Sequence, residues 1–157
     1  MLKICFVCLG NICRSPMAEF IMKDKIAKAG LTNEFYIDSK AISPEEEGNR
    51  LYYAAREKLK EKNIPYEKHN STPLFKEDYP KYDYFIGMDI NNINCMHKIF
   101  TKDPEQKIHL LLSFIDKNRE VADPWYTRDF EQAYQDIDLG CKKWLEQLTN
   151  QNQGLHL

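Results

Sequence analysis

The sequence lacks a long apolar run, a surplus of positive charge and an even number of cysteines. No segment approaches the ~18–20 apolar residues that a membrane helix needs. The formal net charge is −2, so no excess of cations is available for a nucleic acid or an anionic membrane. Five cysteines do not fit a secreted disulfide scaffold, which pairs its thiols evenly. We therefore expect reduced thiols and a cytoplasmic protein with neither nucleic-acid nor membrane partners.

The composition is that of a folded chain of ordinary size. With 157 residues, the protein is long enough for one domain, which we expect to span 1–157. The aromatic content of 12% and the nearly balanced charge argue against disorder. One core can absorb the 43% of residues that are hydrophobic, so a monomer is expected.

Short apolar segments rich in β-formers alternate with segments of helical periodicity. The strands are expected at 3–7, 35–39, 84–88 and 108–112, and the helices at 16–30, 50–63, 90–100 and 130–148. Ser15, Asn49 and Asp89 are suitable N-caps for the first three helices. This alternation predicts an α/β fold with four parallel strands and helices on both faces. Ligands of such sheets bind beyond the carboxyl ends of the strands.

The segment after the first strand has the composition of a phosphate-binding loop. Successive backbone N–H groups between a strand and a helix can turn inward around an anion, and the helix N-terminus adds its dipole. Gly10 permits close approach of the backbone, and Asn11 tolerates a left-handed conformation. Arg14 can hold two phosphoryl oxygens with its planar guanidinium. The expected phosphate-binding residues are Leu9, Gly10, Asn11, Ile12, Cys13 and Arg14.

Cys8 lies at the base of this loop and is the expected nucleophile. The surrounding donors would favour its thiolate form, and Ser15 could donate a further hydrogen bond to the sulfur. A chain of this composition should contain the pattern C-x5-R-[ST] by chance only about 0.01 times. Cys13 either forms a reversible disulfide with Cys8 or packs as a small residue beneath the loop.

Aryl phosphate hydrolysis needs a proton donor for the leaving oxygen, and the chain offers two Asp-Pro pairs. Asp103 precedes the fourth strand and so belongs to the opposite edge of the sheet. Asp123 follows that strand and shares an edge with Cys8, so topology favours Asp123 as the general acid. Trp125 and Tyr126 could form flat walls for a phenyl ring.

The segment from Val7 to Pro16, VCLGNICRSP, resembles the signature of the low-molecular-weight protein tyrosine phosphatases. The likeness continues through IDS at 37–39, FIGMD at 85–89 and DPWY at 123–126. It implies hydrolysis of phosphotyrosine in proteins through a cysteinyl-phosphate, without metal or cofactor. It also implies the flavodoxin-like phosphotyrosine phosphatase I fold with strand order 2-1-3-4. Within this likeness, Asn11, Ser39 and His69 match a hydrogen-bond network that holds the loop open.

The chain departs from that family at Glu45–Glu47, where the family usually carries an aromatic residue that influences substrate preference. A solvated charge run before a helix is the simpler interpretation, and the functional alternative is that three carboxylates near the mouth of the site repel acidic phosphopeptides. Whether Tyr126 is itself phosphorylated stays open.

Two other functions are compatible with a cysteine-containing anion loop. A thioredoxin-coupled arsenate reductase would need a further cysteine pair after the third strand, where this chain has only Cys95. A non-catalytic phosphoprotein-binding module would not need Cys8, Arg14 and Asp123 together. A phosphatase is therefore the preferred hypothesis.

Overall fold

The chain folds around one parallel sheet of four strands. The computed structural model describes residues 1–151. Its strands are β1 (Leu2–Cys8), β2 (Phe35–Ala41), β3 (Tyr84–Gly87) and β4 (Ile108–Leu110). They are arranged in the order β2-β1-β3-β4, and every neighbouring pair is parallel. The expected sheet and strand order are confirmed.

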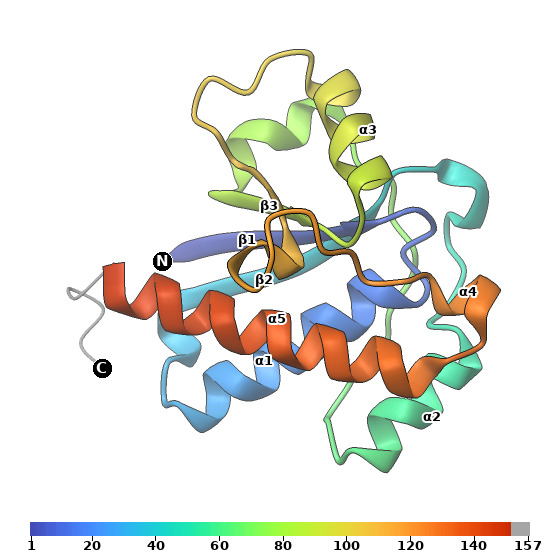
Figure 1. The fold of residues 1–157 in the computed structure, drawn as a ribbon. Helices are drawn as coiled ribbons and strands as arrows, with labels where there is room; N and C mark the ends of the chain where they lie inside the picture. The colour runs from blue at the N-terminus through green and yellow to red at the C-terminus, as the bar shows by residue number, and fades with distance from the viewer. Residues whose placement is uncertain (152–157) are drawn as a thin grey trace.

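Helices cover both faces of the sheet (Figure 1). The helices are α1 (Arg14–Lys28), α2 (Tyr53–Glu61), α3 (Ile90–Phe100), the short α4 (Pro124–Thr127) and α5 (Phe130–Gln151). Helices α1, α2 and α5 lie on one side of the sheet, and α3 lies on the other (Figure 1). The helix α4, which the sequence did not predict, lies in the connection between β4 and α5.

The alternation of side chains along β1 creates two hydrophobic cores. Ile4 and Phe6 belong to the larger core, which contains residues of α1, α2 and α5. Cys5 and Val7 point to the opposite face, where they join a smaller core with residues of α3. Because β1 is buried on both faces, its end is a fixed point from which the next loop departs.

Two of the expected N-caps, Ser15 and Asn49, are wrong. The helix α1 begins at Arg14 with Cys13 as its N-cap, because the Cys13 carbonyl already accepts the N–H of Met17. The Ser15 hydroxyl instead faces Cys8. Asn49 does not cap α2, because residues 49–50 are tied to residues 70–71 through backbone hydrogen bonds and an isolated bridge. Asp89 caps α3 as expected.

The fourth strand is shorter than the expected 108–112. After Leu110 the chain turns into the 3-10 helix Leu111–Phe114, and the Trp144 indole N–H donates to the Leu111 carbonyl at 3.0 Å. Further 3-10 helices at Thr32–Glu34, Pro44–Glu46 and Lys76–Lys81 were not predicted either. Such single turns carry too little periodicity to be recognised.

Among residues 1–151, none of the helices combines the length and apolar character required to cross a lipid bilayer.

Candidate active site

Cys8 is the last residue of β1, and its sulfur lies at the base of the loop formed by residues 8–15. The side chain is buried, with 3% of the residue exposed. Its Sγ accepts the backbone N–H groups of Asn11 at 3.3 Å and Ser15 at 3.4 Å, and lies 3.0 Å from the Ser15 hydroxyl oxygen. Donors that converge on sulfur favour the thiolate over the thiol.

The direction of the Ser15 hydrogen bond follows from its neighbours. The Thr72 backbone N–H can only donate, and it reaches Asn11 Oδ1 at 3.1 Å. The Asn11 Nδ2 group must therefore be the end that faces Ser15, whose Oγ accepts from it at 2.8 Å. The Ser15 hydroxyl keeps its own proton for donation, and Cys8 Sγ, which already accepts two backbone N–H groups, lies within reach of it at 3.0 Å. Asn11 adopts the expected left-handed conformation (φ 57°) and is fully buried.

The carbonyls of the loop point away from the site and are held by a second layer of residues. Gly10 O accepts the Ser71 hydroxyl at 2.8 Å, and Asn11 O accepts His69 Nε2 at 2.7 Å. Ile12 O accepts the Tyr52 N–H at 2.9 Å. Fixing these carbonyls outward fixes the peptide planes of the loop. Sequence reasoning missed Ser71 and Tyr52, since no local pattern distinguishes them from the other serines and tyrosines of the chain.

Arg14 is buried at the first position of α1 and is held by three partners. Its Nη1 donates to Asp89 Oδ2 at 2.9 Å and to the Val121 carbonyl at 2.8 Å, and its Nη2 donates to Asp123 Oδ2 at 3.4 Å. Burial by itself would lower the pKa of Arg14, but the negative charges of Cys8, Asp123 and Asp89 outweigh burial and raise it. The guanidinium is therefore a permanent cation beside the loop. Asp89, expected only to cap α3, also positions Arg14.

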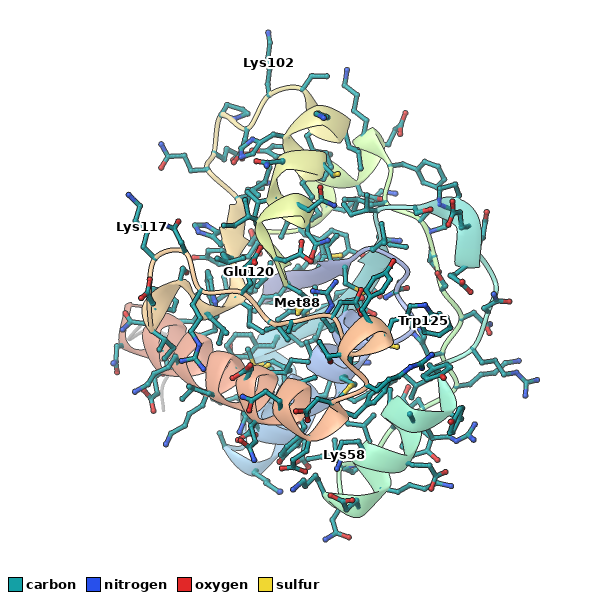
Figure 2. The ribbon with its side chains drawn as sticks, turned by 45° about the vertical axis from the view of Figure 1, so that its right-hand side comes forward. Lys58, Met88, Lys102, Lys117, Glu120 and Trp125 are labelled. Carbon is teal, nitrogen blue, oxygen red and sulfur yellow. The ribbon has the colours of Figure 1, made fainter. Side chains whose placement is uncertain are left out.

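The loop that carries Asp123 is pinned to the end of β3. The Val121 N–H donates to the Met88 carbonyl at 2.9 Å, and the Ile90 N–H donates to Glu120 Oε2 at 2.8 Å. Figure 2 shows Met88 and Glu120 near each other at this edge, with Trp125 beyond them on α4. Asp123 itself caps α4 through a 3.0 Å hydrogen bond from the Trp125 N–H to Oδ1.

The loop residues and Asp123 line one pocket of about 150 Å³. Trp125 and Tyr126 form part of its wall, with 40% and 76% of each residue exposed. Glu45 and Glu46 line the same pocket, whereas Glu47 does not. The lining residues are Cys8, Leu9, Gly10, Asn11, Ile12, Cys13, Arg14, Ser43, Glu45, Glu46, Asp123, Trp125 and Tyr126. The phosphate-binding, acid and specificity residues expected from the sequence thus lie together.

Asp103, the alternative acid, lies elsewhere. Its carboxylate accepts the N–H groups of Lys107 and Ile108 at the beginning of β4, far along the sheet from the carboxyl ends of the strands. The topological argument that favours Asp123 is consistent with this placement.

Ser39 does not join the network that holds the loop. It lies within β2 rather than after it, and its hydroxyl donates to Glu19 Oε1 of α1 at 2.6 Å. No hydrogen bond among the described residues connects Ser39 with the loop. The structure therefore corrects its expected role: Ser39 links β2 to α1. His69, in contrast, contacts the loop directly.

The other thiols near Cys8 differ from it in their surroundings. Cys13 is buried at the N-terminus of α1, and burial, with the nearby negative charge of Cys8, raises the pKa of its thiol. Cys5 lies three residues before Cys8 but on the opposite face of the sheet, where burial raises its pKa as well. Both favour the protonated thiol. All five cysteines are free, and the described residues contain no cluster of three or more potential metal ligands.

The fold and the loop define an α/β protein with a cysteine-centred oxyanion site at the carboxyl edge of its sheet. The family model for low molecular weight phosphotyrosine protein phosphatase matches residues 3–154. A low molecular weight protein-tyrosine-phosphatase of Bacillus subtilis, YfkJ, is 34% identical over 98% of this chain and 99% of its own length. The chain belongs to the low molecular weight phosphotyrosine protein phosphatase family.

Solved structures agree with this assignment. The crystal structure of YfkJ has a TM-score of 0.92 and covers 97% of each chain. A low molecular weight protein tyrosine phosphatase from Streptococcus pyogenes has a TM-score of 0.85 at 40% identity, covering 94% of this chain and 93% of its own. A Drosophila arginine phosphatase is also similar, with a TM-score of 0.84 at 29% identity, covering 94% and 98% of the two chains.

Proposed function

We propose that the protein hydrolyses phosphotyrosine in proteins through a phosphocysteine intermediate formed on Cys8. The observation that carries this proposal is the convergence of hydrogen-bond donors on one buried sulfur, beside a permanent guanidinium and a carboxylate. A sulfur so placed is a nucleophile rather than a structural thiol.

In the first step the Cys8 thiolate attacks phosphorus and the bond from phosphorus to the tyrosyl oxygen breaks. The loop N–H groups and Arg14 bind the equatorial phosphoryl oxygens and neutralise their charge. The phosphoryl oxygens accept hydrogen bonds from the Arg14 guanidinium. The carboxyl group of Asp123 is thereby released from its 3.4 Å contact with Arg14 Nη2. Asp123 takes up a proton from solvent once it has left Arg14, and it then transfers this proton to the leaving phenolic oxygen.

In the second step water attacks the phosphocysteine. Asp123, now a carboxylate, takes a proton from this water as the new P–O bond forms and the S–P bond breaks. The hydrogen bond from Ser15 favours departure of the sulfur as a thiolate. Inorganic phosphate then leaves, and the enzyme returns to its starting protonation state.

The pocket favours an aryl phosphate because Trp125 and Tyr126 offer flat rings to a phenyl group. Arginine phosphate is a second candidate substrate, because one similar structure is that of a Drosophila arginine phosphatase and because Glu45 and Glu46 could accept N–H groups of a guanidine. The aromatic wall formed by Trp125 and Tyr126 leads us to expect phosphotyrosine as the better substrate.

The finer features of the protein are also proposals. A match of the family model to residues 3–154 supports one phosphatase domain over 1–157. Free thiols support a reducing, cytoplasmic environment, and the single sheet with its two cores supports a monomer.

We further propose Cys13 as the redox partner of Cys8. A peroxide oxidises the Cys8 thiol to a sulfenic acid, and the Cys13 thiol then attacks this sulfur and displaces water to form the disulfide.

The test is hydrolysis of p-nitrophenyl phosphate, phosphotyrosine and phosphoarginine in excess EDTA, by the wild type and by Cys8→Ser. We expect the wild type, but not Cys8→Ser, to hydrolyse phosphotyrosine. With a 32P-labelled substrate, rapid acid quench of the wild type should leave 32P on the protein as the phosphocysteine. Cys95→Ser is the control variant, since Cys95 lies on α3 away from the pocket. Full activity of Cys8→Ser would overturn the mechanism, and faster hydrolysis of phosphoarginine would overturn the substrate class.

A further inference from the structure

A second pocket, of about 320 Å³, has a cationic lining that the proposed reaction does not use. Arg50, Arg56 and Lys68 line it together with His69, and Glu67 is its single carboxylate. Arg56 approaches Glu57 at 3.6 Å, with both side chains largely in solvent. In the part of the chain that the structure describes, the side chains of Arg50 and Lys68 form neither ion pairs nor hydrogen bonds. In a chain of net charge −2, this is a local excess of positive charge.

The pocket also has an apolar and aromatic floor. Leu51 is buried, and Tyr66 is half-buried with its ring packed edge-on against Phe20 of α1 at 6.4 Å. Cations around a partly desolvated floor interact with an anion more strongly than cations on an open surface, because water screens them less. The lining thus has the character of an anion-binding site.

The wall of this second pocket is continuous with the layer that holds the phosphate loop. His69 lines the pocket and donates to Asn11 O at 2.7 Å. Leu51 also lines it, and its neighbour Tyr52 donates to Ile12 O at 2.9 Å. His69 thus belongs both to the lining of the second pocket and to the layer that holds the loop, and Leu51 adjoins that layer through Tyr52.

We propose that this second pocket binds a small anion with two or more negative charges, of the phosphate or polyphosphate class, independently of the substrate site. Arg50, Arg56 and Lys68 supply the charge, and Tyr66 supplies a hydroxyl and a ring edge. Occupancy fixes the segment 66–69, and through His69 it stabilises the outward orientation of the Asn11 carbonyl.

The test is calorimetric titration of inorganic pyrophosphate into the full chain after alkylation of Cys8 with iodoacetamide, which blocks the phosphate loop. Alkylation removes binding at that loop from the signal, so the measurement does not depend on whether the protein is a phosphatase. We expect one remaining site in the wild type, and at least tenfold weaker binding in the double variant Arg50→Gln/Lys68→Gln. Each of these changes removes one charged partner, and a tenfold loss corresponds to about 1.4 kcal/mol.

The matched control is Lys102→Gln/Lys117→Gln. These two exposed lysines lie away from Lys58 and α2 (Figure 2), and neither lines the second pocket. The control variant loses the same two positive charges as the test variant. If both double variants bound pyrophosphate equally weakly, the effect would come from the overall charge of the protein and the proposed site would be overturned. Absence of pyrophosphate binding to the alkylated protein would also overturn it. Before alkylation, hydrolysis of p-nitrophenyl phosphate without pyrophosphate should be the same in all three proteins.

Discussion

Replacing Asp123 by Asn separates proton transfer from every other contribution of this residue. Asn keeps the oxygen that accepts the Trp125 N–H at 3.0 Å, so α4 stays capped. The lost ion pair with Arg14 is long, at 3.4 Å, and the Asp123 side chain is 23% exposed, so its loss costs at most about 1 kcal/mol of stability. General acid catalysis contributes about 10²–10⁴-fold, or about 3–5 kcal/mol. A large fall in kcat therefore cannot come from unfolding.

The assay compares two leaving groups under single-turnover conditions. We expect Asp123→Asn to slow hydrolysis of phosphotyrosine about 10²–10⁴-fold, and that of p-nitrophenyl phosphate clearly less, because p-nitrophenolate leaves more readily without a proton. Asp129→Asn is the control, since Asp129 similarly accepts the Gln132 N–H at the start of α5 but lies outside the pocket. Equal losses for both substrates, or equal losses in both variants, would refute the role of Asp123 as general acid.

Three further predictions concern packing, pH and specificity. Gly140→Ala should lower the Tm, because the new Cβ would lie 2.5 Å from Leu111 Cγ and overpacking costs about 1–3 kcal/mol, more than the helix gains; a raised Tm would contradict this packing. The pKa of Glu131 is lowered to about 2, chiefly by hydrogen bonds from lysines at α2, so this group stabilises the fold above pH ~4.5 and loses that contribution as the pH falls towards 2. Glu131→Gln should therefore narrow the difference in urea midpoint between pH 6 and pH 3, and an unchanged difference would argue against it. The double variant Glu45→Gln/Glu46→Gln removes two negative charges beside the pocket, so it should raise kcat/KM for acidic relative to basic phosphopeptides about two- to fivefold at low salt. An unchanged ranking of the peptides would show that these carboxylates do not influence substrate preference.

Most of the fold is predictable from the sequence because the sheet is buried on both faces. A strand such as β1 then shows a continuous apolar run, and the helices between the strands show their own periodicity. The boundaries are less predictable where long-range contacts decide them. Asn49 has the chemistry of an N-cap, yet its carbonyl accepts the Ser71 N–H from another part of the chain. Ser15 also suits a cap, yet Asn11 directs its hydroxyl to Cys8.

The reacting groups of the site are predictable for a different reason. Cys8 ends a strand, Arg14 opens the helix that follows it, and Asp123 comes after a strand of the same sheet. The topology of a parallel sheet therefore brings the three residues to one edge. Their partners come from irregular segments whose positions no periodicity specifies. Ser71 and Thr72 form hydrogen bonds with loop residues 61 positions earlier in the chain. Ser39 lies in a segment that resembles the family's sequence, yet its hydroxyl binds Glu19 of α1 instead of the loop.

The polarity of the site depends on one backbone group that no sequence pattern identifies. The N–H of Thr72 can only donate, so Asn11 must present its oxygen to it and its amide nitrogen to Ser15. Ser15 then keeps its proton for donation, and Cys8 Sγ, which already accepts two backbone N–H groups, lies 3.0 Å from its oxygen. Had the Thr72 N–H faced elsewhere, the Asn11 amide could have turned its oxygen to Ser15, and the Ser15 proton would then have gone to Asn11 rather than to Cys8. The hydrogen bond that Ser15 can offer to the cysteine is thus set by a backbone group outside the loop.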